Sequence, residues 1–257
     1  MFENDTDFLD QHFLIDEKVI DDFVRYACVN KDDHVVEIGP GKGNITKILL
    51  SKANKVTVIE KDDRLIPYLL ELKKKYSNLE IIHGNVLDTF IPDCDKIITS
   101  LPYSIIEPFI NKIIKCKFKT LTMIMGSNYI EEVMNKSNNK LSLLTNSFFN
   151  VEKLEDIGPN CFEPSPRTLS GIIKLSPLKL DKIKDKKMFI IRQLFFYRNM
   201  KIKNALKEAI ISYEDCTQNI AKDKINKLNI EESILEEKME TISNSDLDKL
   251  VKYIERL

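Results

Sequence analysis

A glycine-rich segment followed by an acidic residue is the strongest chemical signal in the sequence. The segment reads Glu37-Ile-Gly39-Pro-Gly41-Lys-Gly43 and lies between a β-branched run and a helical stretch. Glycines in such a turn allow the backbone to approach a ligand closely, and the N-terminus of the following helix carries partial positive charge. Glu60 ends the next predicted strand, where a carboxylate can accept hydrogen bonds from both hydroxyls of a ribose. Together these features predict a site for a nucleoside cofactor.

The spacing of the glycines indicates which cofactor fits. A nicotinamide dinucleotide site has the pattern G-x-G-x-x-G, which requires a third glycine at position 44, and the sequence has Asn44 there. An acid just before the first glycine, here Glu37, suits S-adenosylmethionine sites better. S-adenosyl-L-methionine is therefore the predicted cofactor, and a nicotinamide dinucleotide is the less favoured alternative.

A second motif, Ser100-Leu101-Pro102-Tyr103, directly follows the fourth predicted strand. The carboxyl ends of strands are where ligands bind in a doubly wound sheet. The motif suits methylation of an exocyclic amine, whose nitrogen is a poor nucleophile because its lone pair is delocalised into the ring. A side-chain oxygen and the carbonyl before Pro102 would draw that nitrogen toward a tetrahedral shape, while the Tyr103 ring would stack on the base. Pro102 restricts Leu101 to an extended conformation, which holds the carbonyl in place.

Short β-branched runs alternate with helical stretches between residues 34 and 176. Strands are predicted at residues 34–38, 55–60, 79–83, 96–99 and 120–125, with a closing antiparallel pair at 150–155 and 169–175. Helices are predicted near residues 43–53, 62–76, 104–115, 127–135 and 140–147. This alternation predicts an α/β fold with a parallel sheet and helices on both faces. We expect one domain over residues 1–178 and a helical domain over 179–257, with helices near 185–197, 200–212, 217–227 and 244–256.

Charge is segregated along the chain although the total is near zero. The 257 residues carry 39 Lys and Arg against 40 Asp and Glu, a formal net charge of −1. Residues 1–33 have a net charge of −7, whereas residues 182–207 have a net charge of +8. A basic block favours a nucleic acid partner, which the total charge alone would argue against.

The apolar residues and the Cys and His residues argue against two other classes, membrane-spanning proteins and zinc proteins. No run of 18 apolar residues occurs, so no membrane span is expected. The five Cys and three His lack the spacing of zinc ligands, and no metal site is predicted. Widely spaced cysteines in odd number are typical of reduced thiols in a cytoplasmic protein.

The sequence resembles the ribosomal RNA adenine dimethyltransferases of the KsgA type, with the erythromycin-resistance methylases as close relatives. The matching segments are Gln11-His12-Phe13-Leu14, residues 37–43, Glu60, residues 100–103, Lys140-Leu-Ser142, and residues 161–170 and 196–206. The resemblance covers nearly the whole chain. It implies a doubly wound, Rossmann-like methyltransferase sheet and a small C-terminal all-α domain. It also implies methyl transfer from S-adenosylmethionine to the exocyclic amine of adenines in small-subunit ribosomal RNA.

The resemblance also implies roles for individual residues. Those that would contact the cofactor are Gln11, His12, Leu14, Glu37, Gly39, Gly41, Gly43, Glu60, Asn85 and Ser100. The catalytic motif would be Ser100, Leu101, Pro102 and Tyr103, with Tyr103 stacked on a base that has left its helical stack. The residues expected to contact RNA are Phe162, Arg198, Lys201 and Lys203. The protein is expected to act as a monomer.

The sequence departs from the family pattern at four places. The family has Asn where Ser100 stands and Asp where Asn85 stands; its N-terminal segment is basic rather than acidic, and Gln-Lys-Glu replaces the Met-Gly-Ser-Asn of residues 125–128. At position 100, the side-chain carbonyl of the family Asn reaches farther than the hydroxyl of Ser100. At position 85, the amide oxygen of Asn85 accepts a hydrogen bond without the charge assistance of the family Asp. Three functions therefore stay open: an adenine-amine RNA methyltransferase, a methyltransferase with a shifted target such as the cytosine amine, and a catalytically weak or inactive RNA-binding ribosome-assembly factor.

Overall fold

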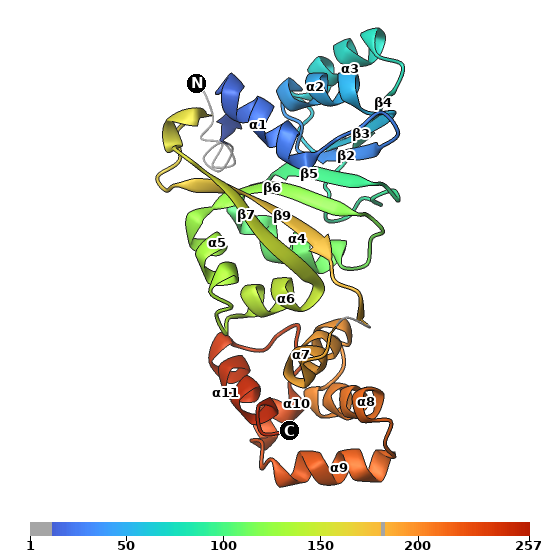
Figure 1. Ribbon diagram of the computed structural model, residues 1–257, viewed down its shortest axis with the longest axis vertical. Helices are drawn as coiled ribbons and strands as arrows, with labels where there is room; N and C mark the ends of the chain where they lie inside the picture. The colour runs from blue at the N-terminus through green and yellow to red at the C-terminus, as the bar shows by residue number, and fades with distance from the viewer. Residues whose placement is uncertain (1–11, 181–182) are drawn as a thin grey trace. The chain divides into compact units, whose positions relative to one another are not determined.

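Seven strands form the central sheet of the protein, in the order β4-β3-β2-β5-β6-β9-β7. The computed structural model describes residues 12–180 and 183–257. The parallel strands are β2 (His34–Ile38), β3 (Lys55–Glu60), β4 (Leu79–His83), β5 (Lys96–Ser100) and β6 (Thr120–Gly126). β9 (Ser170–Pro177) pairs antiparallel with β6, and β7 (Phe149–Ile157) lies beyond it at the edge. The predicted doubly wound α/β sheet is confirmed (Figure 1).

Helices cover both faces of this sheet. One face carries α1 (Glu17–Ala27), α2 (Asn44–Lys52) and α3 (Ile66–Lys75), and the other carries α4 (Ile106–Ile113) and α5 (Ser127–Met134) (Figure 1). A strand covered on both faces is apolar throughout rather than alternating. Val35 and Val36 of β2 face opposite sides of the sheet, and both are 0% exposed.

The strand order reverses between β2 and β5, and this reversal positions the site. β3 and β4 extend the sheet on one side of β2, whereas β5 and β6 extend it on the other. In open α/β sheets, ligands bind at the carboxyl ends of the strands at such a reversal. The Thr99 hydroxyl near the end of β5 donates to the Ile38 carbonyl oxygen at the end of β2, 2.9 Å away. This buried hydrogen bond holds the two strand ends together.

The helix α1 is absent from the sequence prediction. Asp16 caps it, since its side chain accepts a hydrogen bond from the Val19 N–H at 3.0 Å. The buried residues of the helix repeat at helical spacing: Ile20, Phe23, Val24 and Ala27. The helical periodicity is therefore present in the sequence. The segment was interpreted only through its high acidic charge, so the helix was not predicted.

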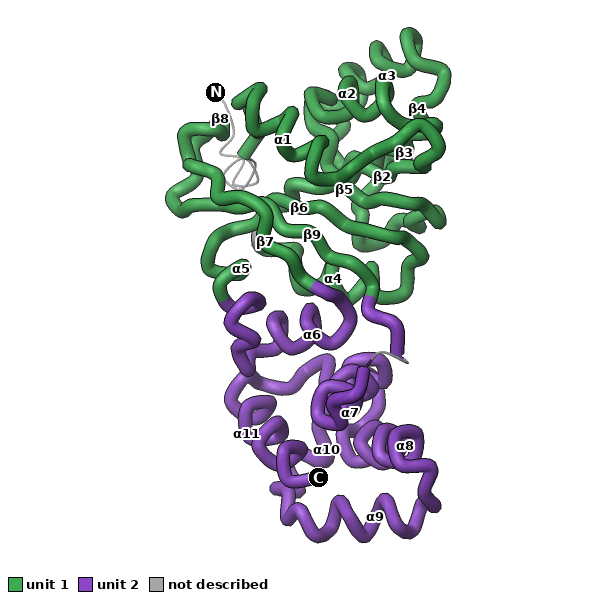
Figure 2. The backbone as a smooth tube through the Cα atoms, viewed as in Figure 1, with its two compact units in different colours: residues 1–131, 151–177 green, residues 132–150, 178–257 purple. Residues whose placement is uncertain are grey.

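The chain divides into two compact units, coloured separately in Figure 2. Among the described residues, unit 1 comprises those up to 131 together with 151–177, and unit 2 comprises 132–150 and 178–257. The helices of unit 2 are α6 (Lys140–Phe148), α7 (Lys186–Phe196), α8 (Ile202–Glu214), α9 (Gln218–Lys227), α10 (Glu232–Glu236) and α11 (Asn244–Ile254). In the described part of the chain, no helix has the length and apolar character needed to cross a bilayer.

Helix α6 groups with the C-terminal helices, although the boundary predicted at residue 178 placed it with the sheet. The Arg192 Nη1 of α7 donates to the carbonyl oxygen of Ser147 at 2.8 Å, and its guanidinium lies 4.4 Å from the centre of the Phe148 ring. These contacts are made between residues far apart in the sequence, so composition around residue 178 does not reveal them.

Candidate functional site

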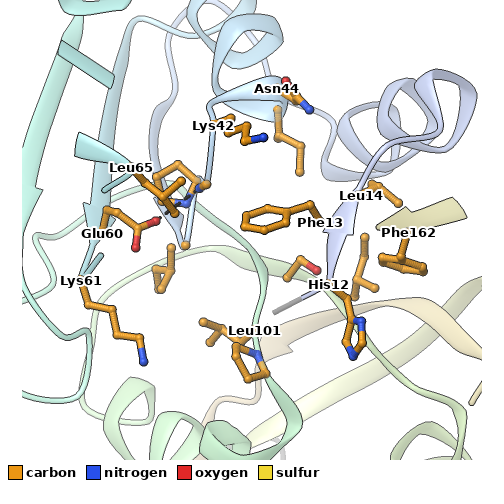
Figure 3. Close-up of a pocket in the computed structure, with 18 of the residues that line it drawn as sticks. His12, Phe13, Leu14, Lys42, Asn44, Glu60, Lys61, Leu65, Leu101 and Phe162 are labelled. Carbon is orange, nitrogen blue, oxygen red and sulfur yellow. Dashed lines mark hydrogen bonds between the residues drawn. The ribbon is translucent and has the colours of Figure 1, made fainter. Parts of the chain in front are cut away.

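A pocket of about 590 Å³ opens at the carboxyl ends of the parallel strands. Its volume is in the range of small-molecule and cofactor sites. The lining residues come from segments 12–15, 38–45, 59–65, 84–86, 100–105 and 162–166, together with Ile124 and Ser170. Figure 3 shows Glu60, Lys61 and Leu65 on one side and His12, Leu14 and Phe162 on the other, with the Phe13 ring between them. The fold thus brings the separate sequence motifs into one pocket.

The glycine turn presents its backbone to this pocket. Gly39, Gly41 and Gly43 have φ of 68°, 58° and 83°, the left-handed region that favours glycine. A Cβ at Gly43 would lie 2.6 Å from Leu72 Cδ1, so a larger residue there would also displace this side chain of α3. Gly39 and Gly41 line the pocket, whereas Gly43 packs outside its wall. Two of the three predicted glycines therefore line the pocket.

Glu60 ends β3 at the pocket wall and is only 4% exposed. Its Oε1 accepts a hydrogen bond from the Asp62 N–H at 2.9 Å, and its Oε2 accepts one from the Gly41 N–H at 3.3 Å. Burial raises the pKa of Glu60, and these backbone N–H donors oppose that rise. A carboxylate has about four acceptor positions, so others are left for a ligand. This acceptor set fits the two hydroxyls of a ribose.

Glu37 lies beneath the glycine turn rather than among the residues that line the pocket. It is 2% exposed, and its Oε2 accepts a hydrogen bond from Thr46 Oγ1 at 2.6 Å. Burial raises the pKa of Glu37 to about 8, and the nearby Glu60 carboxylate contributes to the rise. Glu37 thus links β2 to α2, and it supports the turn instead of facing the pocket.

We expect Glu37 to make the stability of the ligand-free protein fall as the pH rises. Its pKa of about 8 in the folded state lies above the ordinary value of 4.5, so the folded state retains a proton that the unfolded state has lost between these values. The contribution to stability is full below pH 4.5 and is lost as the pH rises toward 8. Between pH 5.5 and 7.5, the free energy of unfolding of the wild type should fall by about 2 kcal/mol because of Glu37, and Glu37→Gln should not show this fall. Urea unfolding at several pH values measures it.

The control for this measurement is Glu71→Gln, which removes a carboxyl that is 64% exposed on α3. Its stability profile should run parallel to that of the wild type over the same pH range. If the stability profile of Glu37→Gln also runs parallel to that of the wild type, Glu37 is ionised in the folded state and burial does not raise its pKa.

The short strand β1 (Phe13–Leu14) closes one side of the pocket by pairing antiparallel with β8 (Phe162–Glu163). His12 Nδ1 donates to the carbonyl oxygen of Pro164 at 2.7 Å. The Phe13 ring lies against the glycine turn, since a Cβ at Gly41 would be 3.2 Å from its edge. Phe162 is 5% exposed; it lines the pocket and also belongs to the hydrophobic core. Sequence reasoning assigned no role to Phe13, because a two-residue strand has no periodicity to detect.

The motif of residues 100–103 begins at the last residue of β5. Ser100, Leu101 and Pro102 line the pocket, and a Cβ at Gly39 would lie 3.8 Å from Leu101 Cδ2. The motif therefore faces the glycine turn. Tyr103 starts a 3-10 helix (Tyr103–Ile105), and its side chain lies outside the described atoms. Gln11 likewise lies outside the described residues.

Asn85 lines the pocket at the loop after β4. Its Oδ1 accepts a hydrogen bond from the Leu87 N–H at 3.0 Å, and its Nδ2 donates to Asp88 Oδ2 at 3.1 Å. These bonds fix the orientation of the amide, whose oxygen has a second lone pair for a ligand. Lys42 and Lys61 also line the pocket, and the sequence prediction gave neither a role (Figure 3). Each of these lysines lies directly beside a residue that was predicted to contact the cofactor, and this adjacency could have identified it.

The basic block of residues 182–207 is partly neutralised by carboxylates within unit 2. Lys201 and Lys203 both pair with Glu236, whose pKa the hydrogen bonds from these lysines lower to about 2. Lys186 and Lys187 pair with other acids, Glu214 and Glu255. The net charge of +8 overstates the positive charge of the folded surface, because it counts only neighbours in the sequence.

The two arginines of this block have different surroundings. Arg192 Nη1 donates to the Leu178 carbonyl at 3.0 Å as well as to Ser147, and it is held inside unit 2. Arg198 is half-buried, and no carboxylate of the described residues pairs with it. The contact between Arg198 and RNA stays a prediction. In the same described residues, no cluster of three or more metal-ligating side chains occurs.

Known proteins share both the sequence and the fold. The family profile described as ribosomal RNA adenine dimethylase matches residues 2–245. A ribosomal RNA small subunit methyltransferase A of Clostridium botulinum (strain Loch Maree / Type A3) is 36% identical over 222 residues, which cover 80% of this chain and 81% of that protein. The crystal structure of a dimethyladenosine transferase from Plasmodium falciparum has a TM-score of 0.65, 24% identity, and coverage of 95% of this chain and 98% of that chain. That of the 23S rRNA methyltransferase ErmE has a TM-score of 0.62, 18% identity, and coverage of 95% and 99%. The resemblance predicted from the motifs is confirmed, and the chain belongs to the ribosomal RNA adenine dimethylase family.

Proposed function

We propose that the protein transfers methyl groups from S-adenosylmethionine to the exocyclic amine of adenine in small-subunit ribosomal RNA. The observation that carries this proposal is the meeting of the glycine turn, Glu60 and the motif of residues 100–103 in one pocket at the reversal of the sheet. The Clostridium relative named as a small subunit methyltransferase supports the substrate class.

The residues of the pocket fit the proposed cofactor by their donors and acceptors. The buried Glu60 would accept hydrogen bonds from the ribose hydroxyls, and the amide oxygen of Asn85 would accept one from the adenine amine. The backbone of Gly39 and Gly41 permits a close approach, while His12 and Leu14 would cover the cofactor from the side of β1. The cofactor supplies a methyl group on a positively charged sulfur, which makes that carbon electrophilic.

The residues at the end of β5 would activate the target amine. The Ser100 hydroxyl and the Leu101 carbonyl would accept its two N–H groups and draw the nitrogen lone pair out of conjugation with the ring. Tyr103 and Phe162 would flank the base once it has left its stack. Positioning of this kind can lower a barrier by about 7–11 kcal/mol, and a neutral amine needs little base catalysis.

We further propose a division of labour along the chain. Residues 1–178 would hold the cofactor and the target base, and residues 179–257 would contact RNA through Arg198, Lys201 and Lys203. The partly exposed side chains of Lys201 and Lys203 support this assignment, as does the lack of a paired carboxylate at Arg198 among the described residues. We propose a monomer that acts in the cytoplasm, on the RNA of the small ribosomal subunit.

Methyl transfer to purified RNA tests the proposed function. The protein is incubated with labelled S-adenosylmethionine and small ribosomal subunits that lack adenine dimethylation, and the labelled nucleosides are separated. We expect label in N6-methylated adenosine. Ser100 in place of the family Asn favours one alternative, methylation of the cytosine amine, which would place the label in methylcytidine. RNA binding without transfer of label would instead support the assembly factor.

A further inference from the structure

A carboxylate stands between the two lysines that the proposed function assigns to RNA. Lys201, at the start of α8, and Lys203 each pair with one oxygen of Glu236, at the end of α10. The three side chains are 49%, 42% and 35% exposed. The cluster, which we call the Lys–Glu–Lys cluster, is therefore open to solvent and to a macromolecular partner.

The backbone holds these two segments together without help from Glu236. The Ile202 N–H donates to the Glu237 carbonyl at 2.7 Å, and the Glu240 N–H donates to the Arg198 carbonyl at 3.1 Å. Lys201 also forms an antiparallel bridge with Lys238. These backbone contacts join the two segments independently of the Glu236 side chain, so Glu236→Gln is expected to keep the fold.

A second carboxylate held by two lysines provides a contrast within the same unit. Glu214 pairs with Lys186 and Lys224, but it is only 18% exposed. Lys186 also donates to a backbone oxygen of Leu257 at 2.5 Å, so it makes a second contact within unit 2. Glu214 fits a structural role, whereas the more exposed Glu236 is placed to respond to a partner.

A carboxylate and a phosphate diester present the same features to a pair of ammonium groups. Each offers two oxygens that share one negative charge, and each can bridge two lysines. Ion pairs between exposed groups are weak, because water competes for both partners. An RNA strand brings many phosphates at once, so its phosphate can replace the carboxylate where the rest of the RNA is held by further contacts.

We propose that Glu236 occupies the place of an RNA phosphate between Lys201 and Lys203 and that bound RNA displaces it. The inference rests on the proposed function, since it takes RNA as the partner. Glu236 reduces the charge of the cluster from +2 to +1 in the free protein. Its effect is to weaken the binding of RNAs that make no other contacts and so to increase selectivity.

The experiment measures RNA binding by Glu236→Gln at several salt concentrations, with an unrelated RNA duplex as the probe. The control is Asp223→Asn, which removes an equal charge from exposed α9 in the same unit. At 0.1 M salt, we expect Glu236→Gln to bind the duplex about fivefold more tightly than wild type. The slope of log K against log salt should steepen by about 0.9, because the cluster presents one more net positive charge to the RNA.

A second substitution separates displacement from a change in structure. Lys203→Gln should cost more affinity in the Glu236→Gln background than in the wild type, because Glu236 no longer offsets the lysine. Equal losses in both backgrounds, or equal effects of Glu236→Gln and Asp223→Asn, would overturn the inference. Failure of the proposed function is distinct, because it would appear as RNA binding without any methyl transfer by the wild-type protein.

Discussion

Glu60→Gln is expected to weaken the binding of S-adenosylmethionine about 100-fold, which corresponds to about 2.7 kcal/mol. The carboxylate is buried at the pocket wall, where hydrogen bonds to a charged acceptor are strongest. Gln offers one acceptor oxygen in place of two, and it carries no charge. The variant should stay folded, because each of the two turns also has a backbone hydrogen bond of its own, from the Gly43 N–H to the Pro40 carbonyl and from the Leu65 N–H to the Asp62 carbonyl. Isothermal titration measures the affinity, and thermal unfolding checks the fold.

The matched control is Glu163→Gln, since Glu163 also lines the pocket but on the side of β8. Glu163→Gln should change the affinity by no more than about threefold, because only the general negative potential is reduced. This pair of variants separates a specific contact from a change in net charge. An affinity of Glu60→Gln close to that of Glu163→Gln would show that Glu60 does not hold the ribose.

Ser100→Ala is expected to lower kcat for methyl transfer by about 10- to 100-fold, with little change in the affinity for the cofactor. The hydroxyl ends β5 inside the pocket, where it would accept an N–H of the target amine. Its loss removes an acceptor that matters most as the nitrogen becomes tetrahedral, so kcat falls more than binding does. Single-turnover kinetics with RNA under saturating cofactor give this rate directly.

Ser100→Asn provides the comparison for Ser100→Ala. Asn restores the longer acceptor that is typical of the family, and we expect a rate at least equal to that of the wild type. If Ser100→Ala is as fast as the wild type, the hydroxyl is not an acceptor for the amine. A gain in Ser100→Asn together with no loss in Ser100→Ala would mean that the natural residue contributes nothing to transfer.

The sheet and the pocket loops could be predicted because their signals are local. β2, β3 and β4 lie at the predicted bounds, since β-branched runs end at glycine or acidic residues. The glycine turn and the motif of residues 100–103 follow strands whose parallel order brings them to one edge. The pocket could therefore be predicted from the sequence.

Other features depend on contacts between distant segments and could not be predicted in this way. β1 gains its structure from β8, about 150 residues later, and a two-residue strand has no pattern of its own. The Lys–Glu–Lys cluster forms because residues 201–203 fold against residue 236. The charges along the sequence predict a basic surface at this place, but the fold puts a carboxylate between the two lysines.

The central claim is that this protein methylates the adenine amine in small-subunit ribosomal RNA. The most direct test is mass spectrometry of ribosomal RNA nucleosides from cells with and without its gene, and from cells that carry the Glu60→Gln variant instead. We predict that dimethyladenosine in the small-subunit RNA is lost without the gene and is not restored by the variant. An adenine methylation profile that is the same in all three would contradict the claim.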